Sequence, residues 1–148
     1  MLQSPLLHPQ ILNALGRAGH GSKVLLSDGN FPHWTARGPN AEMVYLNLAP
    51  GLLGVPAILQ VLAKIIPIEA AQIMAVNTSG AYVLKEDPPI WKEFTRLLTP
   101  TDCKGELTKL ERFAFYDAAK ADDVCLTIAT GEQAIYANLL LTIGVVRG

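Results

Sequence analysis

Residues 19–28 have the sequence Gly-His-Gly-Ser-Lys-Val-Leu-Leu-Ser-Asp, and this stretch decides the expected fold. The apolar run Lys23–Ser27 predicts a strand buried on both faces, as in the parallel sheet of an α/β protein. His20 lies in the glycine turn before this strand, and Asp28 follows its carboxyl end. Such proteins place ligand sites in loops and at the carboxyl ends of strands. Since imidazole exchanges protons near neutral pH, the stretch indicates a proton-transfer site.

The remaining chain alternates between helical and extended patterns. Helices are expected over residues 9–18, 56–66, 90–98 and 113–120, and strands over 23–27, 42–48, 71–76, 106–111, 124–129 and 134–146. Asp87 is placed to cap the third helix. The last two strands are expected to pair in antiparallel fashion, because only a short glycine-containing segment joins them. The alternation predicts an α/β layered domain with a mixed sheet, spanning residues 1–148.

The composition narrows the class of protein. A chain of 148 residues suits one domain with a real core. Half of the residues are hydrophobic and only 17% are charged, which suggests that copies of the chain cover one another's apolar surface. A net charge of −1 without a basic tract argues against nucleic acid and anionic membranes as partners. No signal peptide or membrane-spanning pattern is present, so a cytoplasmic location is expected.

Motifs for metals and nucleotides are missing from the sequence. Cys103 and Cys125 form no CxxC pair, and Cys125 is expected to be a small buried hydrophobe. His8 and His33 are too far from His20 along the chain for a local metal motif. Neither of the glycine-rich phosphate-binding patterns nor the nucleophile elbow of hydrolases occurs. The sequence therefore predicts no metal and no cofactor.

Each residue near the first strand has a structural alternative to a functional role. His20 is either a proton-transfer group or a loop histidine that bonds to the backbone. The flanking glycines favour function slightly, because they let the backbone approach a ligand closely. Asp28 either caps its loop as an Asx turn, or accepts hydrogen bonds from hydroxyl groups, or orients His20.

Four further residues in the second half of the chain are candidates for a polar ligand site. Arg112 either stacks among aromatic residues or donates a fork of hydrogen bonds to a polyol. Tyr116, one helical turn later, is typical of a core-edge residue. Tyr136 and Asn138 would point to the same face of a strand, which is a mild signal for a polar ligand.

Taken together, these residues resemble the ribose pyranase/fucose mutarotase family over essentially the whole chain. The matching pieces, in chain order, are His8-Pro9, Gly19-His20-Gly21, Ser27-Asp28, Asn30-Phe31-Pro32, Glu111-Arg112-Phe113-Ala114-Phe115-Tyr116, Thr130-Gly131-Glu132, Tyr136-Ala137-Asn138 and Gly144-Val145. The segments at 30–32 and 112–116 look like the fucose branch. The segment 136–138 has the form common in the ribose branch, so the natural sugar stays open.

The resemblance implies a single three-layer α/β/α domain with a mixed, mostly parallel sheet. It also implies a cytoplasmic homo-oligomer, often a decamer, with sites near subunit interfaces. The implied activity is that of an isomerase that interconverts the anomers of a free monosaccharide, L-fucose or a similar sugar, by acid–base ring opening and closure. Two alternatives remain: a D-ribose pyranase, which interconverts pyranose and furanose forms, and a non-catalytic sugar-binding or transport-accessory module.

The resemblance also implies roles for individual residues. By position, His20 would be the general acid that donates a proton to the ring oxygen. The sugar would be held by Asp28, Arg112, Tyr136, the backbone of Ala137, and Asn138, with Tyr116 as an additional candidate. The base at the anomeric hydroxyl group stays unidentified between Tyr136, Asp28 and a bound water.

Overall fold

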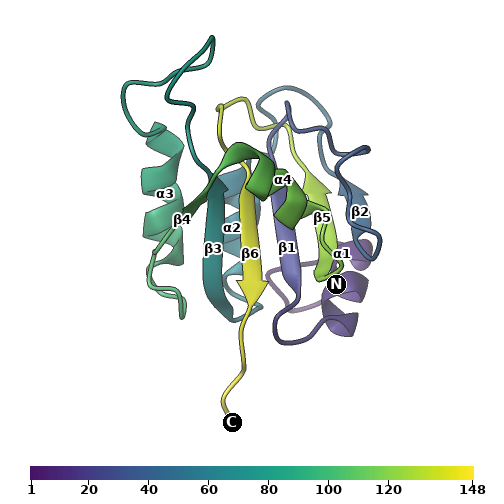
Figure 1. Cartoon of the computed structure of the whole chain (residues 1–148). Coiled ribbons are helices and arrows are strands. Elements are labelled where there is room, and N and C mark those ends of the chain that lie inside the picture. The colour runs from purple at the N-terminus through teal and green to yellow at the C-terminus, as the bar shows by residue number, and fades with distance from the viewer.

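A computed structural model describes residues 1–148 and places one six-stranded sheet at the centre of the molecule (Figure 1). The strands are β1 (Lys23–Ser27), β2 (Glu42–Tyr45), β3 (Ile68–Met74), β4 (Thr108–Leu110), β5 (Val124–Ala129) and β6 (Leu139–Ile143). Their order across the sheet is β2-β5-β1-β6-β3-β4. Only β6 runs antiparallel to its neighbours, β1 and β3, and the other neighbours are parallel. The predicted α/β fold with a mixed, mostly parallel sheet is confirmed.

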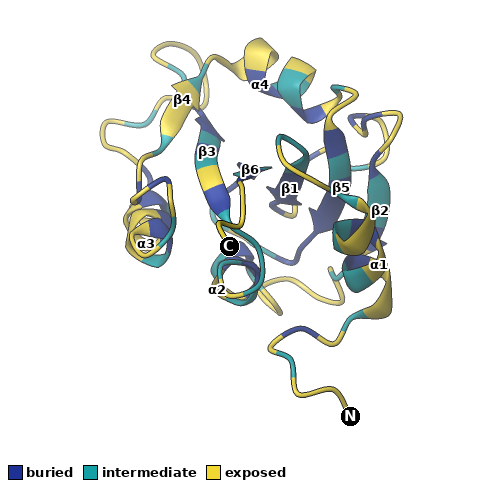
Figure 2. Ribbon diagram, turned by 90° about the horizontal axis from the view of Figure 1, so that it is seen from below, coloured by how far each residue is buried: buried dark blue, intermediate teal, exposed yellow.

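Helices cover both faces of this sheet, but unequally. They are α1 (Pro9–Arg17), α2 (Val55–Leu62), α3 (Pro89–Leu98) and α4 (Arg112–Ala119). Figure 2 shows α1, α2 and α3 on one face and α4 alone on the other. The core is divided accordingly into a cluster of 23 buried residues beneath the three helices and one of nine beneath α4 and the loop after β1. The result is a three-layer α/β/α arrangement with one thin layer.

The first helix and strand follow directly from local sequence signals. Pro9 occupies the first turn of α1, and the imidazole of His8 accepts a hydrogen bond from the Ile11 N–H at 3.5 Å. In β1, Val24, Leu25 and Leu26 are fully buried because β5 and β6 flank the strand and helices cover both faces. The predicted strand has the observed bounds.

Several predicted element ends differ from the observed bounds, and two of the differences have identifiable reasons. Asp87 does not cap α3, because Pro88 takes the N-cap position and the Asp87 carboxylate instead accepts from Lys109 Nζ at 3.0 Å. The last strand begins at Leu139 rather than residue 134. Tyr136 has a φ of 56°, a left-handed conformation that no strand accommodates.

The expected antiparallel pairing of the last two strands is also wrong, because β1 lies between β5 and β6. The segment that joins them is tied across the end of β1 by several hydrogen bonds. Thr130 Oγ1 donates to the Ser27 carbonyl oxygen at 2.8 Å, and the Gly29 N–H donates to the Glu132 carbonyl oxygen at 2.8 Å. The segment therefore passes over the carboxyl end of β1 instead of forming a hairpin turn.

This topology brings three chain segments together at one end of the sheet. The parallel strands β1 and β3 end there, and the antiparallel β6 begins there, at the top of Figure 1. The α4 helix lies over the same edge in that view. Among the helices, none combines the length and apolar character needed to cross a bilayer.

Candidate active site

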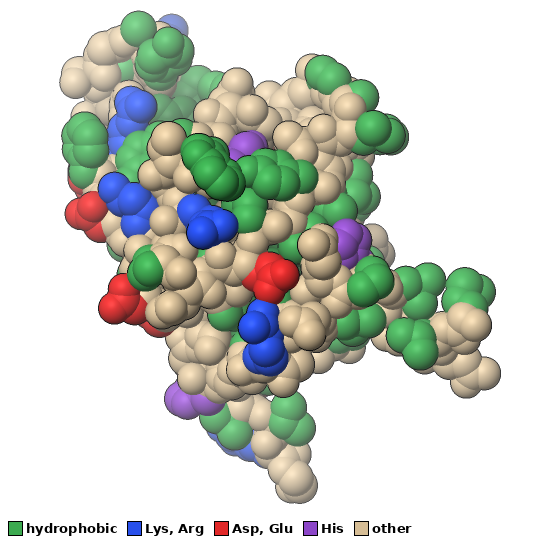
Figure 3. Space-filling model, turned by 90° about the vertical axis from the view of Figure 1, so that its right-hand side faces the viewer, with side chains coloured by type: hydrophobic (Ala, Val, Ile, Leu, Met, Phe, Trp, Pro, Cys, Tyr) green, Lys and Arg blue, Asp and Glu red, His purple; other side chains and the backbone are tan.

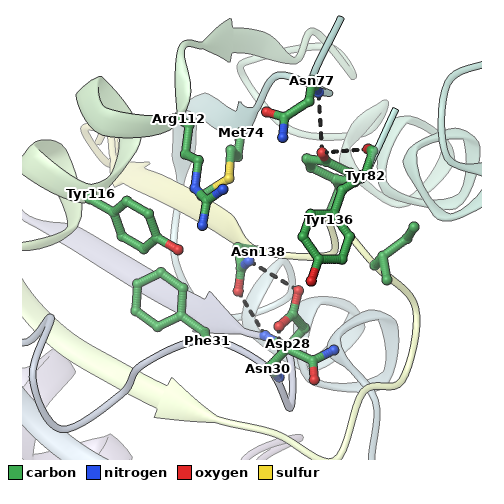
Figure 4. A pocket seen from close by; sticks show the side chains of 11 residues that line it. Asp28, Asn30, Phe31, Met74, Asn77, Tyr82, Arg112, Tyr116, Tyr136 and Asn138 are labelled. Atoms are coloured by element: carbon green, nitrogen blue, oxygen red, sulfur yellow. Dashed lines mark hydrogen bonds between the residues drawn. The ribbon is translucent and has the colours of Figure 1, made fainter. Parts of the chain in front are cut away.

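A cavity of about 420 Å³ opens at the edge where β1 and β3 end (Figure 4). Its walls come from the loops after β1 and β3, from α4, and from the segment before β6. Eleven residues line it: Asp28, Asn30, Phe31, Met74, Asn77, Tyr82, Arg112, Tyr116, Ile135, Tyr136 and Asn138. Five of the residues predicted from the sequence therefore meet in one pocket, although Asp28 lies far along the chain from the other four: Asp28, Arg112, Tyr116, Tyr136 and Asn138.

Asp28 is the residue with the most hydrogen bonds in the pocket. Its Oδ1 atom accepts from the Asn30 N–H at 3.0 Å, which is the Asx turn that the sequence allowed. Its Oδ2 atom accepts from Asn138 Nδ2 at 3.0 Å and from the Ala137 N–H at 3.3 Å. Asn138 Oδ1 in turn accepts from the Asp28 N–H at 2.8 Å, so the two side chains hold each other (Figure 4).

The electrostatic state of Asp28 follows from this setting. The residue is only 3% exposed. Burial raises the pKa of the Asp28 carboxyl group above its ordinary value, and the N–H groups of Asn30 and Ala137 oppose that rise. The nearby carboxylate of Glu132 adds a smaller upward contribution to the pKa of Asp28. A carboxylate in this state accepts a proton more readily than an exposed one.

Tyr136 is fixed at both its backbone and its hydroxyl group. Its carbonyl oxygen accepts from the buried Trp91 Nε1 at 2.9 Å. Its hydroxyl group accepts from the Asn77 N–H at 3.1 Å and donates to the Tyr82 carbonyl oxygen at 3.1 Å. These contacts hold a non-glycine residue in the left-handed conformation, which costs about 1–3 kcal/mol in general. They also attach the loop after β3 to the pocket.

Arg112 and Tyr116 form the wall contributed by α4. The carboxylate of Glu111 caps this helix by accepting from the N–H groups of Phe113 and Ala114 at 2.9 and 3.2 Å. The Arg112 guanidinium lies 5.9 Å from the centre of the Tyr116 ring and forms no ion pair within the chain. Its donors therefore remain available to a ligand in the pocket.

Ala137 occupies a different place from the other predicted residues. Its side chain is fully buried, and its N–H already donates to Asp28. Its contribution to the site in this structure is to orient that carboxylate.

His20 lies at the opposite end of the sheet from the pocket. It precedes β1, its neighbour Gly21 donates to the Ile143 carbonyl oxygen at 2.9 Å, and its Nε2 atom lies 3.1 Å from both carboxylate oxygens of Glu69. The five residues of β1 span about 16 Å at 3.3 Å per residue, so His20 cannot touch Asp28 of its own chain. The three histidines occupy separate places on the surface (Figure 3).

Six lining residues were not selected from the sequence: Asn30, Phe31, Met74, Asn77, Tyr82 and Ile135. The position of Asn30 and Phe31 directly after Asp28 was an available signal. Asn77 and Tyr82 lie in the loop after β3, and parallel strands place such loops at the same sheet edge. Nothing in the local sequence distinguishes the two loop residues from their polar neighbours.

The Thr130-Gly131-Glu132 segment has a structural role beside the pocket. The Glu132 carboxylate accepts from the Val55 N–H at the start of α2 and from the Ala134 N–H, at 3.2 and 2.9 Å. A side chain at Gly131 would collide with the carbonyl oxygens of Ala49 and Leu52. The segment thus holds the loops around the pocket in place.

Other reactive side chains are dispersed. No three His, Cys, Asp or Glu side chains are grouped so that they could hold a metal ion. Cys103 is buried and Cys125 is half-buried, and neither forms a disulfide. Burial raises the pKa of the Cys125 thiol, whose Sγ atom lies 3.2 Å from the Lys23 carbonyl oxygen. The polar side chains that the structure does bring together are those of the pocket, among them Asp28, Arg112, Tyr136 and Asn138.

Comparison with known proteins gives a consistent result. A sequence model of the RbsD / FucU transport protein family matches residues 1–146. The fucose mutarotase of Mus musculus is 35% identical over 147 residues, which cover 94% of this chain and 90% of that protein. The crystal structure of FucU from Bifidobacterium longum superposes with a TM-score of 0.78 at 32% identity and covers 95% of both chains. The fucose mutarotase from Streptococcus pneumoniae, solved in complex with L-fucose, gives a TM-score of 0.80 at 25% identity over 99% of this chain and all of that one.

Proposed function

Because this chain belongs to the RbsD / FucU transport protein family, we propose that it is a monosaccharide mutarotase with L-fucose or a similar sugar as its substrate. Such an isomerase opens the ring of a free sugar and closes it on the other face of the anomeric carbon. The observation that carries the proposal is the pocket at the carboxyl ends of β1 and β3, with its paired Asp28 and Asn138 and its unengaged Arg112. A cavity of about 420 Å³ has room for one monosaccharide.

Ring opening needs one proton delivered to the ring oxygen and one removed from the anomeric hydroxyl group. We assign the second role to Asp28, since burial raises the pKa of its carboxyl group and so improves it as a base. The Tyr136 hydroxyl group is less suited, because it already donates to the Tyr82 carbonyl oxygen. Positioned acid–base groups contribute about 10²–10⁴-fold to such steps.

The remaining polar groups would hold the far end of the sugar. Arg112 donates a fork of hydrogen bonds to neighbouring hydroxyl groups, and Tyr116 and Asn138 add single contacts. After ring opening the anomeric carbon must rotate. The pocket therefore has to grip the opposite end of the sugar and leave the anomeric end free to turn.

We propose that His20 is the general acid and that a second copy of the chain supplies it. Within one chain His20 stands at the amino end of β1 and the pocket at the carboxyl end. Tyr82 and Ile135, which line the pocket, are 70% and 49% exposed, and Phe113, the neighbour of Arg112 in the sequence, is 70% exposed. Apolar side chains in this arrangement favour cover by another subunit, which would bring its own His20 to the site.

The test is saturation-transfer proton NMR on L-fucose and on D-ribose with catalytic amounts of the protein. Saturation of one anomeric proton should pass rapidly to the other with L-fucose, and it should vanish in His20→Ala while sugar binding persists. Faster exchange between pyranose and furanose signals of D-ribose would instead assign the ribose pyranase activity. Binding of both sugars without any exchange would contradict the enzyme and favour a sugar-binding module.

A further inference from the structure

Asn77 lines the pocket with a side-chain amide that nothing in the chain engages. Its backbone N–H donates to the Tyr136 hydroxyl group at 3.1 Å, whereas the amide group itself makes no hydrogen bond within the chain. The residue is half-buried, and Figure 4 shows its side chain on the side of the pocket where Arg112 and Met74 lie. Since a polar group taken out of water costs free energy until it finds a partner, this amide is suited to bind a polar ligand.

The loop after β3 holds Asn77 in a defined place. The Tyr136 hydroxyl group accepts from the Asn77 N–H and donates to the Tyr82 carbonyl oxygen, at 3.1 Å each. Asn77 and Val83 also form an isolated parallel bridge, which closes the loop on itself. All of these contacts use the backbone of Asn77 and leave its side chain free. The amide is therefore presented to the pocket from a fixed backbone, which lowers the entropic cost of binding.

The strand order sets the distance between Asn77 and Asp28. Asp28 follows β1, Asn77 lies beyond the end of β3, and β6 runs between these two strands. Two strand intervals amount to about 10 Å. A pyranose ring with hydrogen bonds of about 2.8 Å at both ends fills a gap of this order. Figure 4 shows the two residues at opposite ends of the pocket, so a sugar whose anomeric hydroxyl group meets Asp28 turns its far hydroxyl groups toward Asn77.

The amide adds a kind of hydrogen bonding that its neighbours lack. An ionised Asp28 only accepts hydrogen bonds, and Arg112 only donates them. A carboxamide does both, so it can accept from one hydroxyl group and donate to the next one on the ring. Neighbouring hydroxyl groups opposite the anomeric carbon are those on carbons 3 and 4.

From this geometry we propose that Asn77 is a further sugar-binding residue, which selects monosaccharides that carry hydroxyl groups on carbons 3 and 4. This rests on the proposed function, in which Asp28 faces the anomeric hydroxyl group. Asn77 takes no part in proton transfer. Its loss weakens the binding of the sugar and leaves the chemical step at the other end of the pocket intact.

The first test measures binding and turnover separately in the full-length protein. Isothermal titration calorimetry should give a Kd for L-fucose about tenfold higher in Asn77→Ala and in Asn77→Leu than in the parent, because the hydrogen bonds of the amide are lost. Saturation transfer should show a raised KM and an unchanged kcat. The leucine variant keeps the volume of the side chain, so it separates lost hydrogen bonds from emptied space.

Asn47→Ala is the matched control. Asn47 is an exposed asparagine in the loop after β2 and lines a separate hollow, so its loss should leave Kd unchanged. The melting temperatures of all three variants should equal that of the parent, since Asn77 supports its loop through backbone groups. A parent-like Kd in both Asn77 variants would overturn the proposal.

The second test asks which hydroxyl groups Asn77 contacts. L-Fucose derivatives that lack the 3-hydroxyl or the 4-hydroxyl group should bind the parent more weakly. With at least one of them, Asn77→Ala should cost less than about twofold, because the contact is already absent. A tenfold cost that persists with both derivatives would refute the assignment. If the parent binds L-fucose without exchanging its anomers, the proposed function fails, while the binding data still decide the role of Asn77.

Discussion

At the residue scale, the pocket depends on polar side chains that are also parts of the fold. Asp28 accepts three hydrogen bonds from within the chain, and Tyr136 uses its hydroxyl group to anchor the loop after β3. Arg112 is the exception, because it has no ion-pair partner and is exposed. Substitutions at the first two positions will disturb both folding and sugar binding, whereas Arg112 separates the two effects.

Arg112→Gln is therefore expected to weaken sugar binding without loss of stability. Loss of its charged donors to hydroxyl groups should raise KM for L-fucose about tenfold. The melting temperature should stay unchanged, because the side chain is exposed and unpaired. Saturation-transfer kinetics and thermal unfolding measure the two quantities. Arg96→Gln, on the exposed face of α3, is the matched control, and equal KM values in the two variants would contradict the assignment.

His33 gives the fold a dependence on pH that is separate from catalysis. Its Nδ1 atom lies 2.8 Å from Ser27 Oγ, and burial lowers the pKa of His33 below its ordinary value of 6.5. The stability due to the neutral ring is present above pH 6.5 and is lost as the pH falls through the lower, folded-state pKa. Urea unfolding between about pH 7.5 and about pH 5 should therefore show a steeper loss for the parent protein than for His33→Gln. Equal changes of stability with pH in the parent protein and His33→Gln would contradict this role of His33.

At the element scale, the sequence predicts those elements that carry their own signals. The strand β1 needs only its apolar run and flanking turns, and its predicted bounds are confirmed. The start of β6 could not be predicted, because the left-handed Tyr136 is held by Trp91 and by the loop after β3, which are distant in sequence. The hairpin prediction for β5 and β6 failed for the same reason. The contacts of Gly29 and Thr130 that carry the joining segment across β1 are tertiary.

The helix α3 supports the pocket through one hydrogen bond, that from Trp91 to the Tyr136 carbonyl oxygen. Trp91→Phe keeps most of the buried apolar area but leaves this oxygen unpaired. We expect a loss of about 1–3 kcal/mol in the free energy of unfolding, together with slower mutarotation. Trp34→Phe is the control, because Trp34 is 74% exposed and should change neither quantity. Similar urea midpoints for the two variants would argue against the supporting role of α3.

The loop that crosses the edge of β1 requires glycine at position 131. A methyl group there would meet the carbonyl oxygens of Ala49 and Leu52, so Gly131→Ala should destabilise the fold by about 2 kcal/mol or more. Gly16→Ala is the contrasting variant, since Gly16 lies in α1 with open space around it. It should stabilise the protein by up to about 1 kcal/mol. Thermal unfolding would contradict this account of the loop if Gly131→Ala were as stable as the parent.

At the scale of the whole molecule, two features favour association between copies of the chain. One is the thin layer formed by α4, and the other is the distance between His20 and the pocket. One sheet runs through the molecule, and we propose that residues 1–148 act as a single sugar mutarotase-like domain. From the sequence, the residues proposed to bind the sugar and His20 were expected to form one site, but their positions at opposite ends of the sheet could not be predicted. That separation depends on strand direction and length. If His20 is the general acid, as we propose, the expected oligomer becomes a requirement for catalysis.

The most direct measurement mixes His20→Gln, which should be inactive, with Arg112→Ala, which should keep about a tenth of the parent rate below KM. The first keeps an intact pocket and the second keeps an intact His20. Co-refolded in equal amounts and assayed by saturation transfer below the KM for L-fucose, they should regain about a quarter of the parent rate, because that share of sites combines one intact half from each chain. Mixed assemblies that form but show no exchange above that of the separate variants would contradict a site shared between copies.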